Sequence, residues 1–291
     1  MIGKKEEALL KAFTGMAGGV VHAGSTCGVV SGGAMGLALS HYDEIMDKGL
    51  PAQIGLFARI AEYTDWFKEK YGTSFCRESS GVDFHTIMGV LRYMLPGDKL
   101  MKCCWHIRGA IRYLYDYKEE ALVATQSDHP EQYEPAHCAQ PVLKGIKEKT
   151  GVGDDVLENI SFIFDGGIGL QGGACGALAG AVMGVNLLVG HNISDSSYFA
   201  NLKTAILDSM VLVRDDPPKK LDSANFGKEI IKNFKREAGA LECQAITGRT
   251  FSNWSDFQEY LLSSDRCKGL IELSTKQASY LIESYNSQSQ A

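Results

Sequence analysis

Small and apolar residues follow one another without a single charge from Gly172 to Gly190. Within this stretch Gly176, Gly180 and Gly184 recur at every fourth position, which places them in one row on an α-helix. Glycine destabilises a helix by about 1 kcal/mol relative to alanine. Three glycines in one row therefore predict that another backbone passes close to this face, and that the helix is buried.

The same pattern occurs 148 positions earlier, between Gly18 and Leu39, where the glycine row returns as Gly28, Gly32 and Gly36. Further along, the repeat continues at an offset of 167. There, Phe67, Gly72, Cys76, Gly81 and Phe84 match Phe234, Gly239, Cys243, Gly248 and Phe251. An internal repeat of this length predicts two related structural units.

Most of the remaining chain has the apolar periodicity of amphipathic helices. We expect helices over residues 4–13, 27–48, 51–70, 84–94, 99–118, 138–149, 154–164, 197–213, 222–238, 254–262 and 266–285. Ser25 or Thr26 is expected to cap the helix that follows it. The segments 71–81 and 239–248 are predicted to be loops, and the polar tail 284–291 to be disordered.

These elements predict an all-α fold of two tandem, related helical modules with glycine-rich helix N-termini. The first module spans 1–125 and the second spans 138–291. Between them, residues 126–137 are polar and contain two prolines, so they are interpreted as a solvated linker that includes His129 and His137. The two glycine helices are expected to pack together about a pseudo-twofold axis.

The net charge and the apolar segments of the chain argue against several classes of protein. The 291 residues carry a formal net charge of −6, which argues against nucleic acid as a main partner. The N-terminal segment lacks the apolar core of a signal peptide, so a cytoplasmic location is expected. The stretch 172–190 is barely long enough to span a bilayer and lacks flanking basic or aromatic residues, so a buried helix is favoured over a membrane helix.

Eight cysteines in a reducing compartment indicate metal binding or redox chemistry rather than structural disulfides. In the second half they are widely spaced, which excludes a zinc knuckle with short Cys-x2-4-Cys pairs: Cys138, Cys175, Cys243 and Cys267. The first half has Cys27, Cys76 and the doublet Cys103–Cys104. Four thiolates brought together suit zinc or an iron–sulfur cluster. Because Cys175 begins a helix, its pKa is expected to be lowered by the helix dipole.

The order Cys138, Cys175-Gly-Ala-Leu-Ala-Gly180, Cys243 and Cys267 resembles a redox-active family defined by the pattern Cys…Cys-Gly-Ala-x-x-Gly…Cys…Cys. The same pattern is seen in the non-haem part of split-Soret cytochromes. The resemblance covers residues 138–270 fully and 15–105 in part. In the first copy, Cys27-Gly-Val-Val-Ser-Gly32 departs at the alanine, and no cysteine precedes Cys27.

The resemblance implies redox activity and a cysteine-bound iron–sulfur cluster, of [2Fe–2S] or [4Fe–4S] type, at the four second-half cysteines. The implication is weaker for Cys27, Cys76, Cys103 and Cys104. Electron transfer or redox sensing with a redox partner protein is the leading interpretation. Two alternatives stay open: a thiol–disulfide protein that uses Cys175 and Cys243, and a metal-binding structural protein. The sequence decides neither whether the protein is an enzyme nor whether it forms a homodimer.

Cys103 and Cys104 are adjacent, and neighbouring side chains on a helix diverge by about 100°. Cys103 and Cys104 face one site together only if the helix begins or distorts there, and Pro96-Gly97 lies close enough for a helix start. We therefore expect the first site to be weaker than the second, or to hold no cluster.

Overall fold

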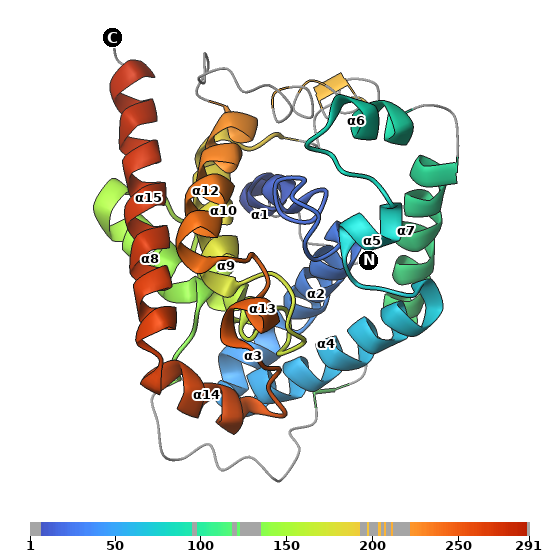
Figure 1. Ribbon diagram of the computed structural model, residues 1–291. Helices are drawn as coiled ribbons and strands as arrows, with labels where there is room; N and C mark the ends of the chain where they lie inside the picture. Colours follow the sequence, from blue (N-terminus) through green and yellow to red (C-terminus); the bar gives the residue numbers. More distant parts are fainter. Residues whose placement is uncertain are drawn as a thin grey trace.

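A computed structural model describes residues 7–94, 98–117, 121–122, 135–192 and 222–289, together with 197, 203, 204, 207 and 211. Within these residues the regular structure is helical apart from two isolated β-bridges (Figure 1), which confirms the all-α prediction. Most of the predicted linker, with His129, lies outside the described residues. So do Pro96-Gly97 and most of the predicted helix 197–213.

The first repeat begins with α1 (Glu7–Phe13) and a 3-10 turn, η1 (Thr14–Met16), and continues with α2 (Gly28–Ser40), α3 (Tyr42–Lys48), α4 (Leu50–Tyr71), α5 (Cys76–Ser80), α6 (Ile87–Met94) and α7 (Asp98–Tyr117). The second contains α8 (Ala139–Thr150), α9 (Asp155–Ile160), η3 (Ser161–Phe164), α10 (Gly176–Val189), α12 (Ser223–Ala238), α13 (Cys243–Thr247), α14 (Trp254–Ser263) and α15 (Asp265–Ser289).

Several boundaries differ from the prediction. The helix expected over 27–48 is broken at His41 into α2 and α3. Both predicted loops contain a five-residue helix, α5 and α13, each with a cysteine as its first residue. The tail is helical as far as Ser289, because Tyr285 packs against Phe226 and serine hydroxyls bond to the carbonyls one turn back.

Each glycine helix is preceded by an unusual left-handed turn. Residues 18–22 all have φ between 50° and 80°, and residues 166–170 repeat this with φ between 58° and 81°. At Gly19 and Gly167 a side chain would also collide with the backbone six residues further on. Left-handed backbone costs a non-glycine residue about 1–2 kcal/mol. Because the same turn recurs at matching positions, we infer that it positions the cysteine that follows it.

The repeat is also visible in the hydrogen bonds that follow this turn. Cys27 N–H donates to Ser74 O (2.8 Å) and Cys175 N–H donates to Leu241 O (2.9 Å). Each cysteine therefore stands at the N-cap of its helix. Its own N–H donates to the extended segment that precedes α5 or α13. The two isolated bridges, Thr26 with Phe75 and Ala174 with Glu242, are the same pair in each repeat.

The repeats are intertwined rather than separate. Helix α1 and η1 of the first repeat pack on α10 of the second, where Lys11 Nζ donates to Leu188 O (2.8 Å). Conversely, α9 and η3 of the second repeat contact α2, and Asn159 Nδ2 donates to the Tyr42 hydroxyl on α3 (3.0 Å). In Figure 1 the blue α1 lies beside α10 and α12 of the other half. Consequently the two repeats share one hydrophobic core.

The glycine row of α10 packs against α8, not against the other glycine helix as expected. A Cβ on Gly180 would lie 2.8 Å from Ala139 O and 3.0 Å from Val142 Cβ. The close backbone approach that the row predicts is therefore present. Among the described residues outside α2, the equivalent Gly32 has no neighbour within 4 Å of such a Cβ, and no helix packs there as α8 does on α10.

Thr26 joins the two repeats instead of capping α2, whose N-cap residue is Cys27. Its buried hydroxyl accepts a hydrogen bond from Ala174 N–H in the second repeat (2.8 Å). Thr26→Val leaves that N–H buried without a partner, so we expect a loss of about 1–3 kcal/mol in the free energy of unfolding, measured by urea denaturation. Thr64→Val is the control, since the Thr64 hydroxyl is buried without a hydrogen-bond partner. An equal loss in both variants would contradict the bridging role.

Candidate functional site

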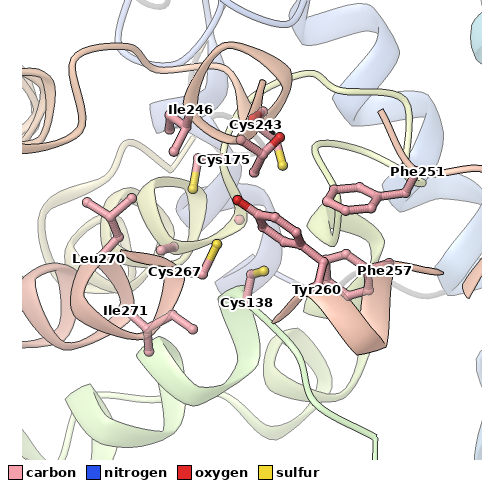
Figure 2. Close-up of a pocket in the computed structure, with 13 residues that line it drawn as sticks. Cys138, Cys175, Cys243, Ile246, Phe251, Phe257, Tyr260, Cys267, Leu270 and Ile271 are labelled. Atoms are coloured by element: carbon pink, nitrogen blue, oxygen red, sulfur yellow. Dashed lines mark hydrogen bonds between the residues drawn. The ribbon is translucent and has the colours of Figure 1, made fainter. Parts of the chain in front are cut away.

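Four cysteines from four separate elements line one pocket in the second repeat (Figure 2). Cys138 and Cys175 immediately precede α8 and α10, Cys243 begins α13, and Cys267 lies in the first turn of α15. Their thiols influence one another electrostatically, since the pKa of Cys138 depends on the charges of the other three. The structure therefore brings together the four second-half cysteines that the sequence singles out.

Backbone hydrogen bonds fix the positions of these cysteines. Cys243 N–H donates to Gly173 O (2.6 Å), which ties α13 to the loop before α10. Cys267 N–H donates to the Ser264 hydroxyl (3.2 Å) at the start of α15. The N–H groups of Leu178 and Ala177, among the first free donors of α10, lower the pKa of the Cys175 thiol. The helix N-terminus thus directs its N–H groups towards the pocket.

Cys138 is held by a buried acid. Asp165 Oδ1 accepts from Cys138 N–H, and Asp165 Oδ2 pairs with His137 Nδ1, each at 2.7 Å. Both side chains are buried, so the interpretation of His137 as a solvated linker residue is wrong. Burial raises the pKa of Asp165, while the neighbouring imidazole opposes that rise. The pair anchors the end of the linker segment beside the pocket.

The expected low pKa of Cys175 is also wrong. Burial raises the pKa of this thiol to about 11, although the N–H groups of Leu178 and Ala177 lower it. Burial likewise raises the pKa of Cys138 and of Cys243 above the ordinary value of 9.0. Removing a thiolate from water outweighs the partial charge of a helix terminus here. Without a bound cation these thiols are protonated near neutral pH.

This shift predicts that the metal-free protein loses stability in alkali. The folded-state pKa of Cys175 lies above the unfolded value, so its contribution is fully present below pH 9 and declines as the pH rises through 11. The difference corresponds to about 3 kcal/mol for this thiol. We expect the urea midpoint of chelator-treated protein to fall between pH 8.5 and 10.5, and to fall less in Cys175→Ala. Identical pH profiles for the two proteins would contradict this assignment.

The walls of the pocket are apolar and aromatic, and they consist of Ile246, Phe251, Phe257, Tyr260, Leu270 and Ile271 beside the cysteines. The Tyr260 side chain extends between the thiols, as Figure 2 shows. The space left is about 20 Å³, room for roughly one water molecule. Tyr260 therefore occupies volume that a larger group among the four sulfurs would need.

The first repeat brings together three cysteines rather than four. Burial, together with the charges of Cys27 and Cys103, raises the pKa of Cys76 to about 12. The α7 helix runs through both residues of the doublet, so their side chains diverge: Cys103 is half-buried and Cys104 is exposed. No cysteine of the described residues takes the place of Cys138 there. Of the two adjacent residues Cys103 and Cys104, Cys103 alone therefore belongs to this cluster.

A tyrosine accompanies each cysteine cluster, and the sequence interpretation missed both. Tyr93 packs against the small core that holds Cys76, and the thiol of Cys103 raises its pKa, as Tyr260 lies among the second-repeat cysteines. The two tyrosines are 167 positions apart, the offset that already relates Cys76 to Cys243. Extending the repeat alignment by one helix would have identified them. The repeat alignment does not identify Asp165, because Ala17 stands at the matching position of the first repeat.

Two further results concern single metal ions and membrane helices. Among the described residues, no three or more His, Cys, Asp or Glu side chains are arranged to hold a single metal ion. Within the same residues, no helix has the length and apolar character needed to cross a membrane.

Comparison with known proteins gives one match. The family model described as "Putative redox-active protein (C_GCAxxG_C_C)" matches residues 1–115 and again residues 136–280. No curated protein and no solved structure matches the chain. The two matched segments correspond to the two repeats seen in the sequence and in the helices.

Proposed function

The chain belongs to the C_GCAxxG_C_C family of redox-active proteins, and from this premise we propose that its second repeat binds an iron–sulfur cluster and exchanges single electrons with a partner protein. The observation that carries the proposal is the convergence of Cys138, Cys175, Cys243 and Cys267 on one pocket. All four are free thiols, and cysteine thiolates are the usual ligands of such clusters.

The surroundings of the thiols fit a cluster in two respects. The N–H groups at the start of α10 point towards the Cys175 sulfur, and hydrogen bonds to sulfur are among the features that set a cluster's potential. The raised pKa values are the second feature, because burial leaves the thiolates unstable until positive charge is bound beside them.

The arrangement of the four cysteines favours a cluster over a single ion. One tetrahedral metal ion with bonds of about 2.3 Å draws its four sulfurs close together. In a cluster, the cysteines bind different iron atoms and stand further apart. The four cysteines surround Tyr260 and lack an arrangement for one ion. A cluster would occupy the volume that Tyr260 now takes, so this side chain has to move on binding.

When bound, the cluster would accept and release one electron at a time. The residues of the chain have separate parts in this function: the four cysteines ligate, α10 donates N–H groups, and Phe251, Phe257 and Leu270 exclude water. Cys267 is the least buried of the four cysteines, so a redox partner would dock on its side of the pocket.

The test is anaerobic purification followed by iron and acid-labile sulfide assays and a visible spectrum before and after dithionite. The proposal predicts iron and acid-labile sulfide in equal amounts, at about two or four of each per chain, and visible absorption that bleaches on reduction. Iron without sulfide would indicate a single thiolate-bound ion. Neither metal nor sulfide, with a reversible loss of two free thiols on oxidation, would indicate the thiol–disulfide alternative.

A further inference from the structure

A cleft of about 630 Å³ lies where the two repeats meet. Its size is typical of sites that bind small molecules, whereas the space left among the second-repeat cysteines is about 20 Å³. Equivalent segments of the repeats form its walls: Gly24 and the start of α5 from the first, and Gly172 and the start of α13 from the second. None of the described cysteines lines it, so the cleft is separate from both cysteine clusters.

Arg77, one of the lining residues, is held in place by the loop before α2. Its Nη2 donates to Ala23 O (3.2 Å) and lies 3.7 Å from Asp83 Oδ1. Gly24 leaves room for the stem of this side chain, since a Cβ on Gly24 would lie 2.7 Å from Arg77 Cβ. Within the described residues Nη2 is the guanidinium nitrogen that has acceptors, so Nε and Nη1 remain available to a ligand.

The repeats differ at a lysine of this junction. In the first repeat, Lys68 Nζ donates to Gln171 Oε1 of the second repeat (2.9 Å). The equivalent lysine is Lys235, which lines the cleft, and Ala23 stands at the position equivalent to Gln171. An alanine side chain cannot accept a hydrogen bond, and across the described part of the chain no other group pairs with the Lys235 amine. The cleft therefore contains a second cation that is free to bind a ligand.

The two cations of the cleft lie close together although they come from different repeats. Burial lowers the pKa of His85, while the charge of Asp83 opposes that change. Three cations lower the pKa of the same imidazole further: Arg77, Lys228 and Lys235. A negatively charged group between Arg77 and Lys235 would be attracted by both.

Two carboxylates also line the cleft. Glu78 accepts from the Thr73 hydroxyl (2.5 Å), and Glu242 is half-buried. Carboxylates accept hydrogen bonds from hydroxyl and amino groups, but they repel a ligand with many negative charges. The lining therefore suits a small organic molecule with one or two acidic groups rather than a polyanion.

We propose that this cleft binds a small organic anion, whose carboxylate or phosphate group lies between Arg77 and Lys235 and whose hydroxyl or amino groups donate to Glu78 or Glu242. Arginine and lysine are the side chains that bind both kinds of oxyanion. The proposal goes beyond electron transfer, because it assigns a second, separate site. A ligand in this cleft contacts residues adjacent in sequence to Cys76 and Cys243, one cysteine of each cluster.

The proposal is tested by isothermal titration calorimetry of the full chain with glycerol 3-phosphate and with malate at constant ionic strength. The wild type is expected to bind at least one of them with a dissociation constant of about 1 mM or lower. Binding of glycerol 3-phosphate alone would assign a phosphate group to the ligand, and binding of malate alone a carboxylate.

Two variants test the part of the free lysine. Lys235→Gln removes the cation, and Ala23→Gln supplies Lys235 with the acceptor that Lys68 has in Gln171. Each variant is expected to raise the dissociation constant at least about tenfold, with an unchanged melting temperature.

Arg236→Gln is the matched control, because it removes the same charge from the next residue of α12, which does not line the cleft. This variant should bind like the wild type. Absence of saturable binding of both compounds would overturn the proposal. So would equal dissociation constants in the wild type, Lys235→Gln and Ala23→Gln. The titrations do not depend on iron, so their outcome is separate from that of the cluster assay.

Discussion

Replacing Cys175 by serine is expected to remove most of the protein-bound iron, whereas Cys27→Ser should remove half or less. Cys175 belongs to the pocket with four cysteines, and its N-terminal position on α10 gives the bound group both a thiolate and N–H donors. Cys27 belongs to the first-repeat cluster, where only Cys76 and Cys103 accompany it. A site that lacks one ligand should hold a cluster weakly or not at all.

The measurement is iron and sulfide per chain, with the visible spectrum, for each variant purified anaerobically. Cys104→Ser is the control, because Cys104 is exposed on α7 and, unlike Cys103, does not affect the pKa of Cys27 or Cys76. Loss of iron in Cys27→Ser but not in Cys175→Ser would show that the assignment of a complete site to the second repeat is wrong. The cysteines of both repeats would then have to contribute to one shared site.

Gly180→Leu is expected to destabilise the fold strongly. Its Cβ would lie 2.8 Å from Ala139 O and 3.2 Å from Ala139 Cα, and backbone atoms cannot turn aside as a side chain can. Overpacking of this kind costs about 1–3 kcal/mol and sometimes more. The displaced helix is α8, which directly follows Cys138, so we also expect bound iron to fall.

A matched pair of alanine variants isolates the cause. Gly180→Ala should still lower the urea midpoint, because the first added carbon already meets α8. Gly32→Ala occupies the same position of the repeat in open space, so it should raise stability by up to about 1 kcal/mol through helix propensity. Equal effects at the two positions would mean that α8 does not press on the row.

The fold class and the repeat follow from local pattern. Helix periodicity, the row of glycines and the 148-residue offset are properties of neighbouring residues, and the helices α4, α8, α12 and α14 lie within two residues of their predicted bounds. The grouping of Cys138, Cys175, Cys243 and Cys267 came from the motif, and the pocket that they line agrees with it.

Other features depend on contacts between distant segments. The sequence placed Cys175 at a helix N-terminus and thereby predicted a low pKa, but the depth of burial decides the sign and raises it to about 11. His137 reads as part of a polar linker until Asp165, buried 28 residues later, provides its partner. The packing of α1 on α10 was equally invisible, because nothing in residues 7–13 says which repeat they join.

By itself, then, the sequence determined the all-α class, the tandem repeat and the set of cysteines, because these depend on spacing along one chain. Only the tertiary structure shows which helix, if any, packs against each glycine row. In the second repeat α8 covers the row, whereas no helix of the described residues covers Gly32 in the first. Among those residues the first cluster has three cysteines, because none takes the place of Cys138, the residue that introduces α8.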